Sequence, residues 1–246
     1  MCVRMDQVMA AERISPTGRG LLAGAWACVP ILLAVAPFGF IFGAVASDAG
    51  LDLVQAMAMT SIVTAGASQL AALHVMSDGA PALVAVLTGA VVNLRMAMYS
   101  ASVALHWEGV PMLWRVLAGY FLHDQAYALS MRRYRARPDE SLSDKLGFYF
   151  GVGLTTVAVW IGTSYVGVVA GRMIPAEWGL GFAVPVCFLA VLGPLLRGRA
   201  NIVAAVVASA AAMALGGLPY GLGLVAASAL GIAAGMLALH RIGRRA

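Results

Sequence analysis

Two ionisable side chains stand out because each lies within a long apolar stretch of the sequence. Arg95 lies in the stretch Ala80–Leu105, and Asp124 lies beside His123 in the stretch Val110–Met131. A charge at membrane depth is costly and normally faces a protein interior or a wet cavity. An arginine can bind a carboxylate through its fork of N–H donors, and a desolvated aspartate beside a histidine can carry protons. We therefore predict that Arg95 binds substrate and that Asp124 and His123 couple protons.

A structural role for the same groups is the alternative. His123 and Asp124 can satisfy each other and nearby carbonyls, and Arg95 can pair with Asp124. Depth argues against that pair, because along straight helices Arg95 would lie about 20 Å from the inner membrane edge and Asp124 about 10 Å. The difference of about 10 Å exceeds a comfortable side-chain reach, so direct pairing requires tilted or broken helices.

A second group of candidates interrupts the apolar stretch Leu53–Met76, where small and hydroxyl residues precede Gln69. One interpretation is a discontinuous helix: Gly66 lets the backbone open, and Ser68, Gln69 and free N–H groups at a half-helix N-terminus bind a substrate carboxylate. The alternative is close helix packing, for which Gly, Ala, Ser and Thr are the usual contact residues. Composition alone favours packing. Thr60, Thr64, Ala67 and His74 share one helical face that is suited to lining a polar path.

A polar stripe is predicted on the helix that carries Arg95. Tyr99, Ser102 and His106 follow Arg95 at helical spacing, and we expect the stripe to run from mid-membrane toward the outer mouth. Asn93 precedes it and is expected, with Arg95, to orient the substrate site or its gate.

Other chemistry finds no support in the sequence. The histidines offer no ligand spacing, and Cys2, Cys28 and Cys187 form no CxxC pair. HExxH and GxxxxGK[ST] motifs are absent, and the nearest match to a GxSG protease motif ends in Gln69. We predict no metal, no cofactor, no catalytic residue and no enzymatic activity.

Composition places these residues in a membrane. Of the 246 residues, 61% are hydrophobic and 11% are charged, whereas soluble domains carry roughly 25% charged residues. The uncharged stretches are too long for barrel strands, so the predicted fold is an all-α polytopic transmembrane bundle of about eight spans. The expected spans are Leu21–Val45, Leu53–Met76, Ala80–Leu105, Val110–Met131, Leu146–Ala170, Gly179–Leu196, and the two halves of Asn201–Leu239, which breaks at Gly216–Gly221.

Charge placement predicts the orientation of the bundle. Most of the sixteen Lys and Arg residues lie before residue 20, between 132 and 145, at 197–199 and after 240, and short basic loops stay cytoplasmic. Both termini are therefore expected in the cytoplasm, while Arg172, Asp48, Asp52, Glu108 and Glu177 are expected in outer connections. The basic excess then sets topology and does not indicate nucleic-acid binding. The expected divisions are a cytoplasmic N-terminal segment (1–20), a transmembrane permease domain (21–240) and a basic cytoplasmic tail (241–246).

Two further patterns concern packing. Pro30 and Pro37 interrupt the first predicted span, and Pro185 and Pro194 interrupt the sixth, which runs in the opposite direction, as in transporters with inverted repeats. In the last span Gly223, Ala227, Gly231 and Gly235 form a small-residue ridge that packs within the bundle or against a partner.

The motifs described above resemble one known family. The segments AGASQLAAL (65–73), VNLRMAMYSAS (92–102) and GFAVPVCFLAVL (181–192), with Tyr120–Leu129 and the Trp160 region, resemble the AzlC family of bacterial branched-chain amino acid permeases, the large subunits of azaleucine-resistance transporters. The resemblance implies export of hydrophobic amino acids beside a small AzlD-type membrane protein in the bacterial cytoplasmic (inner) membrane. Where the family usually reads threonine, aspartate, glutamate, this chain has His123, Asp124 and Gln125, which lacks the second acid.

The function that follows is a secondary transporter subunit embedded in the lipid bilayer, exporting branched-chain or similar hydrophobic amino acids and driven by protons. Two alternatives remain open: a structural membrane subunit that seats a small transporting partner, and a transporter of another small amphipathic substrate.

Overall fold

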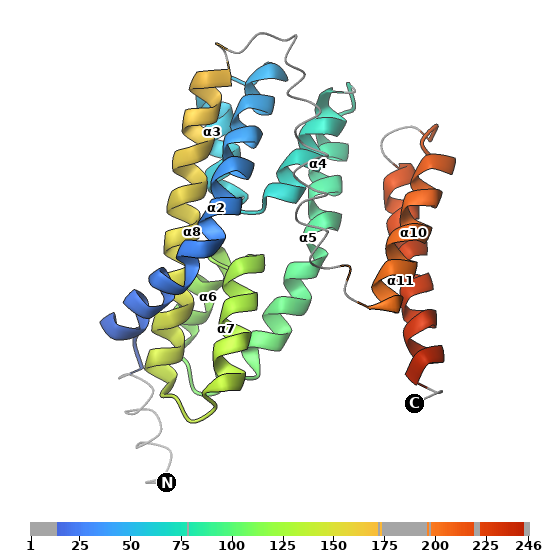
Figure 1. The fold of residues 1–246 in the computed structure, drawn as a ribbon. Helices are drawn as coiled ribbons and strands as arrows, with labels where there is room; N and C mark the ends of the chain where they lie inside the picture. Colours follow the sequence, from blue (N-terminus) through green and yellow to red (C-terminus); the bar gives the residue numbers. More distant parts are fainter. Residues whose placement is uncertain are drawn as a thin grey trace. The chain divides into compact units, whose positions relative to one another are not determined.

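The computed structural model describes residues 14–77, 79–171, 173, 196, 198–218 and 222–243, and its regular elements are α-helices. They are α2 (Gly18–Asp48), α3 (Leu53–Ile62), α4 (Gly66–Ser77), α5 (Ala82–Ala104), α6 (Met112–Tyr120), α7 (Asp124–Ala136), α8 (Leu142–Gly171), α10 (Arg199–Ala214) and α11 (Leu222–Gly243) (Figure 1). The predicted span Gly179–Leu196, with Pro185 and Pro194, lies outside the described residues, as do Arg172, Cys2, Cys187 and residues 219–221 of the predicted turn.

The described residues belong to two compact units. The first comprises Met1–Gln69 and Val92–Pro175, and the second comprises Leu70–Val91 and Ala176–Ala246. All seven predicted site residues, from Gly66 to Asp124, belong to the first unit.

Within the described ranges, three helices are long and apolar enough to cross a membrane: α2, α5 and α8. Their bounds lie within four residues of the predicted spans, because the length of an uncharged stretch fixes the length of a crossing helix. The predicted count of eight spans is not confirmed.

Helices α2 and α8 lie side by side in parallel and form the framework of the first unit. Thr17 caps the start of α2 by accepting from the Gly20 N–H, and it donates to Asp144 near the start of α8 at 2.5 Å. A Cβ on Gly20 would lie 3.0 Å from the Cα of Gly147. Glycine at such contacts lets two backbones approach closely, as is common between membrane helices.

The same close approach recurs toward the other end of the pair. A Cβ on Gly24 would lie 3.0 Å from the Cα of Gly151, and one on Gly43 would lie 3.0 Å from the carbonyl carbon of Gly167. The pairing at both ends fixes the two helices in register along their length.

The end of the first unit where α2 and α8 begin is called the basic end here. The positive charge of Arg19 attracts the Asp144 carboxylate at this end, and Arg133 forms an ion pair with Glu140 in the loop that precedes α8. Hydrogen bonding to Glu140 raises the pKa of the Arg133 guanidinium. The N-terminal part of α2 and the loop around residues 132–145 therefore lie at one end, as expected from their charge.

The predicted span 53–76 consists of two helices. Composition alone had favoured close packing over such a discontinuous helix. Helix α3 ends at Ile62 and α4 begins at Gly66. The Gln69 amide donates to the Met59 carbonyl at 3.0 Å, although ten residues along a continuous helix would separate them by about 15 Å. The chain therefore turns back on itself at residues 63–65, and this stretch is called the first turn.

The predicted span 110–131 is also corrected. Helix α6 ends at Tyr120 and α7 begins at Asp124, and the Trp107 indole before α6 donates to the Tyr134 hydroxyl near the end of α7 at 3.3 Å. The chain enters from the basic end, turns at residues 121–123 and returns, so this segment does not cross. We call residues 121–123 the second turn.

This reversal moves the connection before α6 to the basic end. A Cβ on Gly109 would lie 4.0 Å from side chains of Ile14 and Leu142, both at that end. Glu108, expected in an outer connection, therefore lies at the basic end.

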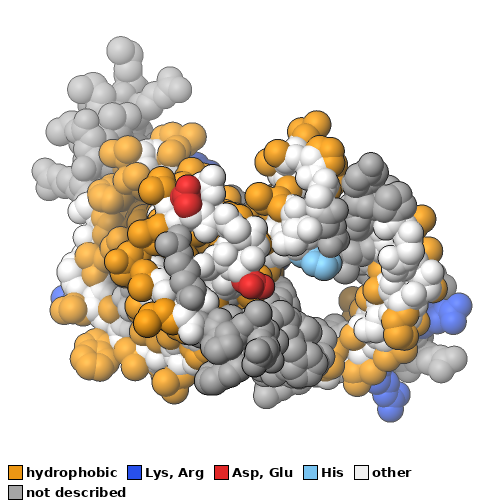
Figure 2. All heavy atoms as spheres, turned by 90° about the horizontal axis from the view of Figure 1, so that it is seen from above, with side chains coloured by type: hydrophobic (Ala, Val, Ile, Leu, Met, Phe, Trp, Pro, Cys, Tyr) orange, Lys and Arg blue, Asp and Glu red, His pale blue; other side chains and the backbone are white. Residues whose placement is uncertain are grey.

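The opposite end of the first unit carries the link from α2 to α3, where Asp52 caps α3 in a capping box with Gln55. Seen from above, patches of hydrophobic side chains lie among backbone and uncharged side chains, and the acidic side chains are isolated (Figure 2). Large side chains on the outer face of α2, such as Trp26 and Leu33, are exposed, as expected of a surface in contact with lipid.

In the second unit, α10 and α11 pack against each other. A Cβ on Gly231 would lie 2.7 Å from the Cβ of Ala208, and one on Gly235 would lie 2.9 Å from the Cβ of Ala204. The small-residue ridge of α11 therefore packs against α10 within this chain.

Candidate functional site

The two turns meet near the middle of α8. The second turn lies against Gly153, where an added Cβ would be 2.7 Å from Phe121. The first turn lies against Trp160, whose ring would be 2.5 Å from a Cβ on Gly66. Because α3 starts from the opposite end and α6 from the basic end, two half-length segments approach each other from opposite ends of the framework.

Two hydrogen bonds join the turns directly. The Thr64 hydroxyl donates to the Tyr120 carbonyl at 3.1 Å, and the Tyr120 hydroxyl donates to the Ser61 carbonyl at 2.7 Å. We call these three residues the turn contact.

Arg95 and Asp124 form an ion pair beside this contact. Arg95 Nη1 lies 3.0 Å from Asp124 Oδ2, and the two side chains are 31% and 43% exposed. The expected depth difference is wrong because α7 begins at Asp124 and runs back to the basic end, so Asp124 lies at mid-depth. A partly exposed ion pair at that depth is unfavourable against lipid, and so we expect it to face protein or water.

The polar stripe of α5 faces α7. The rings of Tyr99 and Tyr127 stack with centroids 4.2 Å apart, the Tyr127 hydroxyl donates to Ser102 at 3.4 Å, and the rings of His106 and Tyr134 lie 5.4 Å apart. Since Tyr134 bonds the Lys145 carbonyl at the basic end, the stripe runs from Arg95 toward that end and not toward the opposite mouth, as had been expected.

Hydrogen bonds from Ser68 and Gln69 stabilise the first turn. Ser68 is 1% exposed and its hydroxyl donates to the Ala65 carbonyl at 2.8 Å, while the Gln69 amide holds the Met59 carbonyl. These donors are occupied, which leaves the backbone near Gly66 and the Gln69 oxygen as the groups here that could contact a polar ligand.

His123 caps α7 and is almost fully buried. Its side chain accepts from the Ala126 N–H, and Nδ1 lies 3.1 Å from Gln125 Oε1. Like Gln69 in the first turn, Gln125 thus supports the turn that precedes its helix.

Several buried polar atoms near the turns have no hydrogen-bond partner within the described part of the chain. Four of them are Gln69 Oε1, Asn93 Oδ1, Arg95 Nε and Trp160 Nε1. Buried polar groups are normally paired, by protein or by ordered water. Three of the four belong to predicted site residues, and so this cluster is where a polar ligand or water would find partners.

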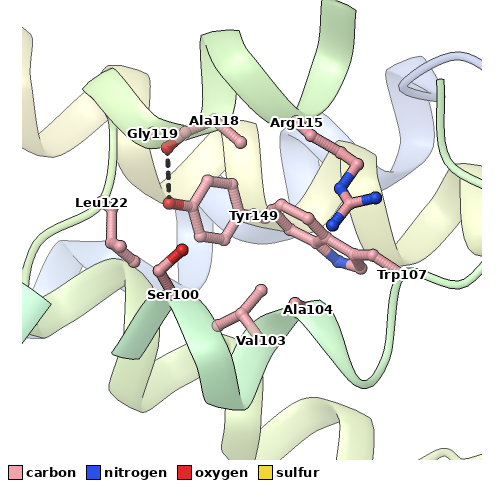
Figure 3. A pocket seen from close by; sticks show the side chains of 9 residues that line it. All are labelled: Ser100, Val103, Ala104, Trp107, Arg115, Ala118, Gly119, Leu122 and Tyr149. Carbon is pink, nitrogen blue, oxygen red and sulfur yellow. Dashed lines mark hydrogen bonds between the residues drawn. The ribbon is translucent and has the colours of Figure 1, made fainter. Parts of the chain in front are cut away.

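A pocket lies on the basic-end side of the second turn, between α5, α6 and α8 (Figure 3). Ser100 and Tyr149 contribute hydroxyls, and the Tyr149 hydroxyl donates to the Ala118 carbonyl at 2.8 Å. The Arg115 guanidinium lies toward Trp107 at the other side of the pocket. The other lining residues are Val103, Ala104, Gly119 and Leu122. Polar and apolar groups therefore line the pocket in equal measure, with a cation at one side.

The site contains three residues that were not among the predicted site residues: Thr64, which was expected only to line a polar path, Tyr120, and Trp160, which packs against Gly66. A sequence signal for the first two exists. Thr64 and Tyr120 are 56 residues apart, and the same shift aligns SQLAAL (68–73) with DQAYAL (124–129), which share Gln, Ala and Leu. Among the described residues, no group of three or more His, Cys, Asp or Glu side chains is placed to hold a metal.

Comparison with known proteins identifies the family of the chain. Residues 30–174, more than half of the chain, match the family described as AzlC protein. The chain belongs to the AzlC family. It is therefore a membrane protein of a transporter family, and the matched range includes both turns and the Arg95–Asp124 pair.

Relatives support the same assignment. The chain is 29% identical to an uncharacterized membrane protein of Archaeoglobus fulgidus over 189 residues, 75% of this chain and 80% of the relative. It is 28% identical to an uncharacterized membrane protein of Helicobacter pylori over 163 residues, 65% of this chain and 69% of the relative. It is 23% identical to inner membrane protein YgaZ of Escherichia coli over 217 residues, 83% and 86% of the two chains. No solved structure matches the chain.

Proposed function

We propose that this AzlC-family chain is the large subunit of a secondary transporter that exports branched-chain or similar hydrophobic amino acids, coupled to proton entry. One observation carries the proposal: two half-length helical segments meet at mid-depth beside the Arg95–Asp124 ion pair. Broken helices at the membrane midplane are the usual framework of substrate sites in transporters.

The charge pair suits a zwitterionic substrate. A bound amino acid would insert its carboxylate at Arg95 and its ammonium at Asp124, replacing their 3.0 Å contact. Unpaired Asn93 Oδ1 and Gln69 Oε1 are acceptors for the ammonium, and N–H groups at the start of α4 are donors for the carboxylate.

Proton coupling follows from competition at Asp124. The ionised carboxylate attracts the substrate ammonium, whereas a proton arriving from the outer side neutralises the carboxylate and releases the substrate. Since proton and substrate ammonium exclude each other on this group, proton entry drives amino acid exit. His123 supports this step by capping α7 and fixing the position of Asp124.

The partner and location belong to the same proposal. A small AzlD-type membrane protein is expected to complete the transporter, and the bacterial cytoplasmic membrane is the expected site. The relative named inner membrane protein YgaZ supports that location.

The test is efflux from proteoliposomes that contain this chain and its small partner and are loaded with labelled valine. Acidifying the outside should accelerate efflux, and a protonophore should abolish the acceleration. Efflux that ignores the pH gradient contradicts proton coupling, and no efflux of any hydrophobic amino acid contradicts the substrate class. Full activity from the partner alone would assign this chain a structural role.

A further inference from the structure

The turn contact joins positions that correspond in two oppositely directed segments. Helix α2 runs away from the basic end and leads to α3 and the first turn, whereas α5 runs toward the basic end and leads to α6 and the second turn. The shift of 56 residues that separates Thr64 from Tyr120 also superposes Gln69 on Gln125. The hydroxyl groups of Thr64 and Tyr120 each donate to a backbone carbonyl of the opposite segment.

Both acceptor carbonyls lie at helix ends. Ser61 lies in the last turn of α3, and Tyr120 is the last residue of α6. Such carbonyls have no partner within their own helix, and at membrane depth bulk water does not supply one. While the turns touch, the hydroxyls of Thr64 and Tyr120 donate to these carbonyls. The turns can therefore separate only where water or a ligand donates to the carbonyls instead.

The contact also lies at the boundary of the pocket on the basic-end side. Gly119 and Leu122, on either side of Tyr120 and Phe121, line that pocket. Tyr120 is 43% exposed, so its side chain is not enclosed by packing on every side. The unpaired atoms of Gln69 and Trp160 lie with the first turn, beyond the contact.

We propose that Thr64 and Tyr120 form a gate between the pocket at the basic end and the substrate site at mid-depth, which rests on the proposed transport function. In the structure the gate is closed. Opening breaks both hydrogen bonds and separates the two turns, in line with the relative movement of repeats in transporters with inverted repeats. The two side chains position the turns and do not bind substrate themselves.

The test measures access past the gate. Ala67, the second residue of α4, is replaced by cysteine in a variant whose three native cysteines are replaced by alanine. The complex with the small partner is reconstituted, and its labelling by a membrane-impermeant maleimide applied at the basic end is timed. Tyr120→Phe and Thr64→Val each remove one hydroxyl donor with little change of shape. Tyr165→Phe, on an exposed face of α8, is the matched control.

Each gate variant should label about five-fold faster than the parent, the factor that corresponds to a lost hydrogen bond of about 1 kcal/mol. The control should label at the parental rate. The double variant should label faster than either single variant, up to about twenty-five-fold faster than the parent, because opening breaks both bonds and their contributions add. Melting temperatures within a few degrees of the parent show that the variants are folded.

Labelling that is unchanged in both gate variants overturns the gate, even if valine efflux is normal. Conversely, faster labelling together with no transport of any hydrophobic amino acid supports the gate and contradicts the proposed substrate. If Tyr120→Phe fails to fold, Thr64→Val alone decides the outcome, because it removes the other bond of the same contact.

Discussion

Arg95 and Asp124 are in direct contact at 3.0 Å because the segment that carries Asp124 reverses at mid-depth. A straight helix through 110–131 would have placed the carboxylate about 10 Å away in depth. The second turn removes that difference and makes Asp124 the first residue of α7, where the positive end of the helix dipole favours a carboxylate.

Removing one member of this pair is predicted to be more harmful than removing both. Arg95→Gln or Asp124→Asn leaves a single charge at mid-depth without its partner, which costs about 3 kcal/mol, the order of magnitude for a lone charge at membrane depth. The double variant leaves no charge. Thermal melting of the purified complex should therefore rank parent, then double variant, then both single variants.

Transport measurements should distinguish the roles of Arg95 and Asp124, which melting temperatures do not. Arg95→Gln should lower valine efflux more than ten-fold, because the carboxylate loses its donors, and the double variant should not recover it. Asp124→Asn should abolish the acceleration by external acid while valine exchange across the membrane persists. Retained pH-driven efflux in Asp124→Asn would move proton coupling to another group.

Gly66→Ala is predicted to displace the first turn. The added Cβ would lie 2.5 Å from Trp160 and 2.7 Å from Phe38, and overpacking of this kind typically costs about 1–3 kcal/mol. Gly162→Ala on α8 is the matched control, since nothing lies within 4 Å of its Cβ. Melting temperature and valine efflux should fall only in Gly66→Ala, and equal behaviour of the two variants would contradict this packing.

The α2–α8 contact is predicted to be equally intolerant of a methyl group. In Gly151→Ala the new Cβ would meet the backbone of Leu21, which cannot rotate away as a side chain can. Gly18→Ala, with open space around its Cβ, serves as control. Yield of folded protein after detergent extraction should drop only for Gly151→Ala, and normal yield would show that the helices can separate.

Bulky substitutions on the ridge of α11 should destabilise the α10–α11 pair itself. Gly231→Leu would meet Ala208 and the Ala204 carbonyl on α10. Ile232→Leu, on an exposed neighbouring position, is the control. Proteolysis of Gly231→Leu in the absence of the small partner should be faster than for the control. If instability appears only as loss of partner binding, the ridge serves an interface between chains.

The long helices were predictable and the reversals were not, for one physical reason. Hydropathy reports how many consecutive residues avoid water, and this number is the same for one crossing helix and for two half-length helices joined by a short turn. Stretches 21–45, 80–105 and 146–170 hence corresponded to α2, α5 and α8, whereas 53–76 and 110–131 each contained a turn.

The charged members of the site were identified by their depth, since an arginine and an aspartate inside apolar stretches need a reason to be there. Tyr120 was not identified, and Thr64 was expected only to line a polar path, because hydroxyl residues are common in membrane helices and become informative only when they face each other. The shared Gln, Ala and Leu in segments 68–73 and 124–129 are a weak signal alone. They support a correspondence of the two segments only together with the contact between Thr64 and Tyr120.

The glycine contacts between α2 and α8 also determine which parts of the first unit are able to move. Backbone lies against backbone toward both ends of this pair, so neither sliding nor rotation of one helix against the other is possible without a collision. The turns, by contrast, are joined by side-chain hydrogen bonds, which break and form readily. Alternating access in this unit would then require displacement of segments about half a membrane thick, with the helix pair as the stationary part.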